Sequence, residues 1–200
     1  MNNNPPKLVL THGQAVWVLS HMGFRTGDSA SAFDSYIKYL RRAGLPFAEE
    51  ELGVGAGQNV VYHYDHLMEL AVALALRAQA ILPGDIVQIL AAQRAKLRPI
   101  YRRAYSDRNS GLGAPCPVKL PGRRQFMVAG VYVDLNLMYG ETGFLGYSDP
   151  RAIGPADAVE LFGTSHRSQH VRGLLNLSEL AEDVVKLAAG APEIRRGRSK

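Results

Sequence analysis

Apolar residues recur at helical spacing in the first half of the chain, and the pattern later changes to strict alternation. Phe33, Ile37 and Leu40 lie three and four residues apart, which places them on one face of a helix. From Met127 to Tyr139 the odd-numbered residues are apolar, which is typical of a half-buried strand, long or bent. The order of these patterns predicts an α+β fold that is mainly α.

The first 45 residues carry the signals of two helices joined by a turn. Thr11-His12-Gly13-Gln14 has the form of a capping box and opens a first helix that ends near Gly23. A polar stretch, 25–30, predicts a turn. Ser31 is expected to start a second helix, and Gly44 is a natural stop for it.

Residues 53–64 have the composition of a glycine-rich wing that ends in a strand. The glycine cluster 53–57 is followed by 59–64, which is rich in β-branched and aromatic residues. Asp65 is expected to cap a third helix. A fourth helix follows the break at 82–85, and Pro99 is expected to end or kink it before one more short basic segment.

The second half of the chain carries weaker signals. The stretch 109–122 is rich in proline and glycine and is expected to be a linker. A short helix is expected at 155–162, and Asn176 or Ser178 should cap a last helix that Gly190 stops. The predicted organisation is therefore a disordered N-terminus (1–8), a winged helix-turn-helix domain with following helices (9–108), the linker (109–122), a small α+β unit suited to dimerisation (123–190) and a basic tail (191–200).

Charge and cysteine content limit the partners and the compartment. Lys and Arg outnumber Asp and Glu by 23 to 18, which suits an anionic partner such as nucleic acid. The single cysteine, Cys116, makes an internal disulfide impossible and suits a reducing compartment. The longest apolar stretch, 67–76, is too short to cross a bilayer. These features predict a soluble, cytoplasmic protein without a membrane partner.

A helix with a basic outer face, a wing and two more helices, in this order, resembles the MerR-like regulators over about residues 9–92. The family's second helix ends in a basic and aromatic stretch followed by Gly-Leu, which here is 36–46. The acidic-x-x-x-Ile-Leu helix of the family matches the segment 82–90. Lys38 and Tyr62 stand where the family usually has arginine. The resemblance implies a sequence-specific transcriptional regulator that binds double-stranded DNA as a homodimer and has no enzymatic activity.

The second helix is the candidate recognition helix, since a helix of this length can enter the major groove. Lys38, Arg41 and Arg42 are suited to phosphates or to guanine, although cations are also favoured at any helix C-terminus. The predicted DNA-binding residues are Arg25, Ser31, Ser35, Lys38, Tyr39, Arg41, Arg42, Gln58, Asn59, Tyr62 and His63.

Two other non-enzymatic functions stay open. The basic run from Arg94 to Arg108, with Tyr101 and Tyr105 interleaved, suits a single-stranded RNA groove or, more simply, a solvated helix surface. The acidic residues 49–51 beside the wing would repel phosphate and favour a protein-interaction or assembly factor. The tail arginines suit a non-specific DNA arm or an unstructured tail.

Catalytic, metal and cofactor motifs are weak, and none is predicted. The glycines of 53–57 lack the Lys-Ser/Thr of a phosphate-binding loop. The pairs His63–His66 and His166–His170 have spacings found in metal sites but come without cysteine ligands. Cys116 lies between two prolines with no obvious partner base.

Overall fold

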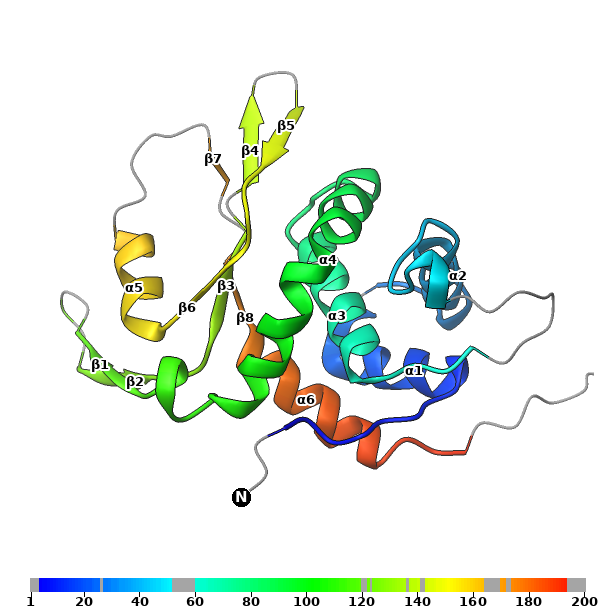
Figure 1. Cartoon of the computed structure of the whole chain (residues 1–200), viewed down its shortest axis with the longest axis horizontal. Coiled ribbons are helices and arrows are strands. Elements are labelled where there is room, and N and C mark those ends of the chain that lie inside the picture. Colours follow the sequence, from blue (N-terminus) through cyan, green and yellow to red (C-terminus); the bar gives the residue numbers. More distant parts are fainter. Residues whose placement is uncertain are drawn as a thin grey trace, which may run out of the picture.

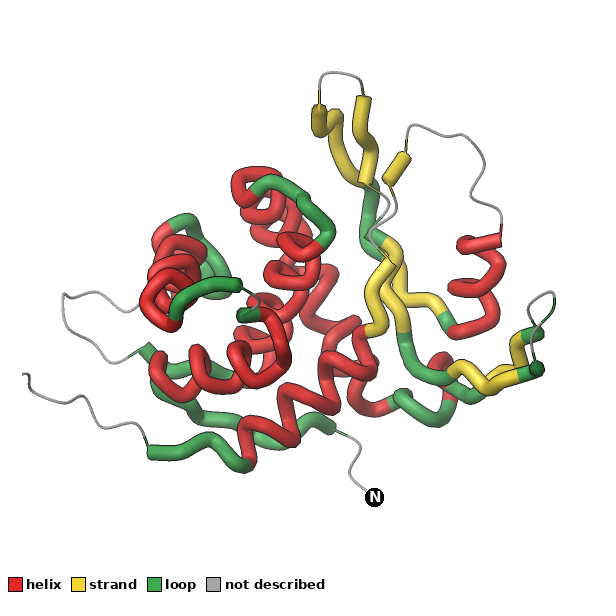
Figure 2. The backbone as a smooth tube through the Cα atoms, turned by 180° about the vertical axis from the view of Figure 1, so that it is seen from behind, coloured by secondary structure: helices red, strands yellow, loops and turns green. Residues whose placement is uncertain are grey.

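The computed structural model confirms a mainly helical α+β fold. It describes residues 4–25, 27–51, 60–119, 122, 124–135, 137–140, 143–163, 170–171 and 174–193. Most of the helices lie together on one side of the molecule, and the strands lie with helix α5 (Pro155–Gly163) on the other side of helix α4 (Pro83–Ser106) (Figure 1). The view from behind shows the same division between helices and strands (Figure 2).

The helical elements are α1 (His12–Leu19), the π-helical turn η1 (Ser20–Phe24), α2 (Ala30–Arg42), the 3-10 turn η2 (Glu49–Glu51), α3 (Tyr64–Ala78), α4 (Pro83–Ser106), the 3-10 turn η3 (Gly111–Gly113), α5 (Pro155–Gly163) and α6 (Leu177–Ala189). The expected capping box at Thr11 and Gln14 is present. Gly23 leaves helical geometry with a φ of 87°. Within the described residues, no helix has the length and apolarity needed to cross a bilayer.

The second helix begins one residue before the position expected from the sequence. The Ser29 hydroxyl, not that of Ser31, caps α2 by accepting from the main-chain N–H of Ala32 at 3.1 Å. At the other end Gly44 takes a φ of 94°, which lets the N–H of Leu45 reach the carbonyl of Leu40 at 2.9 Å. The predicted stop is therefore confirmed.

The third and fourth helices are longer and more continuous than expected. His63, not Asp65, is the N-cap of α3. Pro99 lies inside α4 and does not end it. A proline removes one main-chain hydrogen bond; here Leu97 and Tyr101, on either side of it, are fully buried. Packing of both halves therefore keeps α4 continuous, and the separate segment expected after Pro99 is part of the same helix.

The described residues do not confirm the wing. The glycine cluster 53–57, together with Gln58 and Asn59, lies outside them. Of the expected strand 59–64, the described part forms an isolated antiparallel bridge, in which Tyr62 pairs with Leu10. Residues before Leu10 are held as well, since the Leu8 carbonyl accepts a hydrogen bond from His63 at 2.7 Å. Order thus extends into the segment 1–8 that was expected to be disordered.

The strands are β1 (Cys116–Val118), β2 (Phe126–Val128), β3 (Tyr132–Asp134), β4 (Leu137–Gly140), β5 (Gly143–Tyr147), β6 (Arg151–Ile153), β7 (His170–Val171) and β8 (Leu174–Asn176). They form three antiparallel sheets, β1-β2, β6-β3-β8 and β5-β4-β7. The single strand expected over 127–139 is therefore three short strands in three sheets. Gly130, with a φ of 104°, separates the first two of these strands.

The described part of the expected linker, 109–119 and 122, is structured and packed. It contains η3 and β1, which pairs with β2. The carbonyl of Gly113 accepts from the N–H of Gly130 at 2.9 Å. A Cβ on Gly154 would lie 2.7 Å from the carbonyl oxygen of Leu112, so the two segments touch through their backbones. This stretch connects the two sides of the molecule as a fixed element.

The last helix completes the core of the first half. Asn176 caps α6, as expected, and α6 packs against α1, α3 and α4. Leu177, Ala181 and Val184 are fully buried in the same core as the residues of α3. The Ser178 hydroxyl donates to the carbonyl of Ala104 at 2.7 Å and accepts from the N–H of Val131 at 2.8 Å. Within the described residues, α6 therefore shares its core with α1, α3 and α4.

Candidate nucleic-acid interface

Helix α2 has one buried side and one exposed polar side. Phe33, Ile37 and Leu40 are fully buried, and this row attaches the helix to the core. The opposite side carries five of the residues predicted to bind DNA, and we call it the α2 stripe: Ser31, Ser35, Lys38, Tyr39 and Arg42. At 3.6 residues per turn these five positions fall within one narrow sector of the helix surface. Four are exposed, and the Lys38 side chain is 43% exposed.

A partly buried chain of polar contacts supports the α2 stripe from below. Asp34 accepts from Lys38 at 2.5 Å and contacts Nε2 of His12 at 2.8 Å. Nδ1 of His12 lies 3.0 Å from the Tyr62 hydroxyl. Because a carboxylate only accepts, Nε2 carries the proton of a neutral His12, and Nδ1 accepts from the tyrosine. This chain joins the start of α1, the middle of α2 and the segment before α3.

Burial sets the charge of this chain. It lowers the pKa of His12, which is therefore neutral at pH 7 even though Asp34 favours the cation. Burial also raises the pKa of Asp34, but the hydrogen bonds from Lys38 and His12 outweigh it and leave that pKa below its ordinary value. Asp34 thus stays ionised and holds Lys38 at the edge of the α2 stripe.

The other predicted DNA-binding residues within the described part of the chain differ in exposure, and not all of them can reach DNA. Arg41 is half-buried and lies against the Tyr62 hydroxyl. Tyr62 itself is fully buried against Phe47 and cannot touch DNA, so its assignment was wrong; it orients His12 instead. Arg25 and His63 are exposed, outside α2. Nδ1 of His63 donates to Leu8. The sequence around Tyr62 does not show that this side chain is buried, because its neighbours in the core come from other segments.

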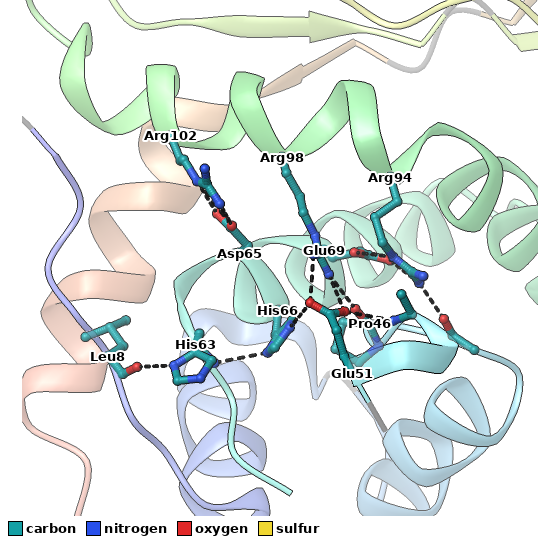
Figure 3. A network of polar contacts seen from close by, with 12 residues as sticks. Leu8, Pro46, Glu51, His63, Asp65, His66, Glu69, Arg94, Arg98 and Arg102 are labelled. Atoms are coloured by element: carbon teal, nitrogen blue, oxygen red, sulfur yellow. Dashed lines mark hydrogen bonds and ion pairs between the residues drawn. The ribbon is translucent and has the colours of Figure 1, made fainter. Parts of the chain in front are cut away.

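The basic run of α4 is neutralised within the molecule. Arg94, Arg98 and Arg102 lie four residues apart and reach toward carboxylates of α3 and η2 (Figure 3). The six pairs are Arg94–Glu69, Lys96–Asp149, Arg98–Glu51, Arg102–Asp65, Arg103–Asp107 and Arg108–Glu182. Tyr101 is fully buried, so it cannot stack on a base. The run is therefore ion-paired, and the side chains of Lys96, Arg102, Arg103 and Arg108 are also 44–59% exposed, as expected for a solvated helix surface.

The pair Glu69–Arg94 also fixes the end of α2. Glu69 is 1% exposed and accepts from Nε and Nη2 of Arg94 at 2.8–3.1 Å. Nη2 of Arg94 also donates to the carbonyl of Gly44, just after α2. Burial raises the pKa of Glu69 to about 7, while the Arg94 contacts favour the ionised form. One arginine thus connects α2, α3 and α4.

Comparison with models of known protein families, with curated proteins and with solved structures finds no match to this chain.

Two of the histidines weighed as metal ligands, His63 and His66, have other partners. Nδ1 of His66 accepts from the main-chain N–H of His63 at 3.2 Å, and Nε2 lies 3.4 Å from Glu51. Burial lowers the pKa of His66. Among the described residues, no group of three His, Cys, Asp or Glu side chains is arranged to hold a metal. His166 lies outside those residues.

Acid should weaken the fold through Glu51. The hydrogen bonds from Arg98 lower its pKa from 4.5 to about 2. Because the folded pKa is the lower one, the stabilisation is complete above pH 4.5 and is lost as the pH falls toward 2. Glu51 is exposed to solvent, so screening reduces the effect to about 1 kcal/mol. We expect Glu51→Gln to lower the free energy of unfolding in urea at pH 6, and this difference from wild type should shrink at pH 3.

The matched control is Glu50→Gln, the exposed neighbour of Glu51. It removes the same charge from the same turn without touching Arg98, and it should leave the unfolding curve nearly unchanged at both pH values. Equal effects of the two substitutions would contradict the role assigned to the Glu51–Arg98 pair.

Proposed function

We propose that the protein is a sequence-specific DNA-binding regulator of MerR-like type that reads the major groove of duplex DNA with α2. The observation that carries this proposal is the α2 stripe. It is polar, basic and exposed on a helix whose other side is anchored in the core. Within the stripe Lys38 is paired with Asp34, but Arg42 has no ion-pair partner among the described residues, whereas the arginines of α4 each pair with a carboxylate.

The dimensions and chemistry of α2 suit this role. Its 13 residues span about 20 Å, and a major groove about 12 Å wide admits a helix. Ser31 and Ser35 near its N-terminus suit base edges, which recognition helices contact with their first turns. Lys38 and Arg42 further along suit phosphates or guanine. Within the described residues Arg42 has no acidic group within ion-pair distance, so its charge is available.

One α2 covers one half-site, so the proposal includes a homodimer that reads two half-sites about 34–36 Å apart. It also includes a cytoplasmic location and the absence of catalysis. The exposed Glu49 and Glu50 lie near the end of α2 and would face phosphate unfavourably. They are the feature that favours a protein partner if DNA fails to bind.

The test is selection from a pool of random duplex DNA at two salt concentrations. We expect enrichment of a partly palindromic site, with affinity that falls as salt rises. The variant Lys38→Ala/Arg41→Ala/Arg42→Ala should bind the enriched site at least tenfold more weakly, since each lost contact to a base costs about 1–3 kcal/mol. The slope of the logarithm of its affinity against the logarithm of salt concentration should become shallower by about 2–3.

The matched control removes three cations elsewhere, in Lys96→Ala/Arg103→Ala/Arg108→Ala. These side chains are about half exposed and lie on α4 or just after it. The control should bind nearly as the wild type does, and circular dichroism should show both variants folded. A pool without enrichment, or equal losses in the two triple variants, would refute recognition by α2.

A further inference from the structure

A pocket of about 450 Å³ lies between η1 and α3. Its apolar wall consists of Met22 and Phe24 from η1 and Leu74 from α3. Arg77 and Asp28 form its charged rim, with Nη2 of Arg77 3.1 Å from the Asp28 carboxylate. The volume is in the range of small-molecule sites, which combine apolar walls with a few placed polar groups.

The wall of the pocket has unusual backbone geometry. Residues Ser20–Phe24 form a π-helical turn, and Gly23 within it has a φ of 87°. Such turns interrupt an α-helix at a cost and are frequent at functional sites. Here the turn presents Met22 and Phe24 to the pocket, both only half-buried. Apolar side chains are thus exposed to the pocket where a regular continuation of α1 would have placed them differently.

Arg77 is held in place by two contacts and keeps donors to spare. Its guanidinium lies 4.1 Å from the centre of the Tyr36 ring, and Asp28 engages one of its nitrogens. A guanidinium has five N–H donors, and within the described residues Asp28 is its one ion-pair partner. Arg77 therefore offers a fixed, forked donor at the rim of an apolar pocket, which matches the geometry of a carboxylate.

We propose that this pocket binds a small carboxylic acid with an apolar body, whose carboxylate pairs with Arg77. The body lies against Met22, Phe24 and Leu74, and the acid shares Arg77 with Asp28. A cationic ligand would face the guanidinium, and the net charge of +5 also favours an anion. This site does not depend on DNA binding. It contacts α2 through Tyr36, whose ring covers Arg77.

The test is a titration of the full chain with 4-phenylbutyrate, and the uncharged 4-phenylbutanol is the paired probe. Calorimetry and ¹H–¹⁵N spectra monitor both titrations. We expect the acid to bind in the millimolar range or tighter and to shift the amide signals of 22–24 and 74–78. The alcohol should bind at least about tenfold more weakly, because it cannot form the charge-assisted hydrogen bonds.

Two variants separate the charge from the fold. Arg77→Gln should weaken binding of the acid about tenfold, and Asp28→Asn should strengthen it by removing the competing carboxylate. Arg103→Gln, on the far half of α4, is the control and should change nothing. Absence of millimolar binding, shifts confined to other residues, equal binding of acid and alcohol, or weaker binding in Asp28→Asn would each overturn the proposal.

Discussion

Removing α6 is expected to unfold the whole helical body, including the α2 stripe. A chain that ends at Asn176 keeps every residue of α1 to α4 but loses Leu177, Ala181 and Val184 from their common core. Each large apolar side chain that is fully buried contributes about 1.5–3 kcal/mol. The loss of this set, together with the newly exposed faces of α1, α3 and α4, is comparable with the 5–15 kcal/mol that stabilises a typical domain.

Circular dichroism and the fluorescence of Trp17 measure this effect. The truncated chain should lack a cooperative thermal transition, whereas a chain that ends at Glu193 should melt as the full chain does. Val184→Asp in the full chain should have an intermediate effect, and Asp183→Ala, at an exposed neighbouring position, should have almost none. A cooperative transition near that of the wild type in the chain that ends at Asn176 would restore the division of the protein after residue 108.

Separating Arg94 from Glu69 should be the most damaging single change among the ion pairs. Arg94→Met leaves the Glu69 carboxylate buried without its partner, which costs about 3–5 kcal/mol. The double variant Glu69→Met/Arg94→Met replaces the pair by apolar groups and should lose much less. Urea unfolding of the wild type, both single variants and the double variant gives the coupling free energy directly.

The pH dependence of Arg94→Met distinguishes a lost charge partner from a packing defect. With Arg94 gone, the pKa of Glu69 rises further in the folded state, because burial and the charge of Glu51 raise it and Arg98 is the remaining group that lowers it. A folded pKa above the unfolded one means that protonation stabilises the fold. The variant should therefore recover part of its stability from pH 8 to pH 5. A deficit that stays constant over this range would point to packing alone.

Local signals allowed the helices to be predicted because each depends on residues close in sequence. The capping box at Thr11, the helix stop at Gly44 and a cap at Asn176, one of the two candidates considered, are all present. The spacing of Phe33, Ile37 and Leu40 also identified the buried side of α2, and hence the stripe opposite to it.

Features that depend on distant residues were missed. Nothing near Pro99 indicates that Glu51 and Asp65 hold the arginines on both sides of it. The alternation of 127–139 gives the faces of a strand but not its breaks between three sheets. Burial of Tyr62 depends on His12 and Phe47, which lie far from it in sequence. Such pairings follow from topology, which periodicity within one segment does not contain.

The position of α6 has a consequence for the speed of folding. Bundles built from helices that are neighbours in sequence have low contact order and fold in microseconds to milliseconds. Here the core closes only when α6 returns to α1, α3 and α4, and the Ser178–Ala104 hydrogen bond alone spans 74 residues. The chain must close this long loop before α6 can cover α3. Its refolding rate in a stopped-flow experiment should therefore resemble that of mixed α/β domains, even though most of its residues are helical.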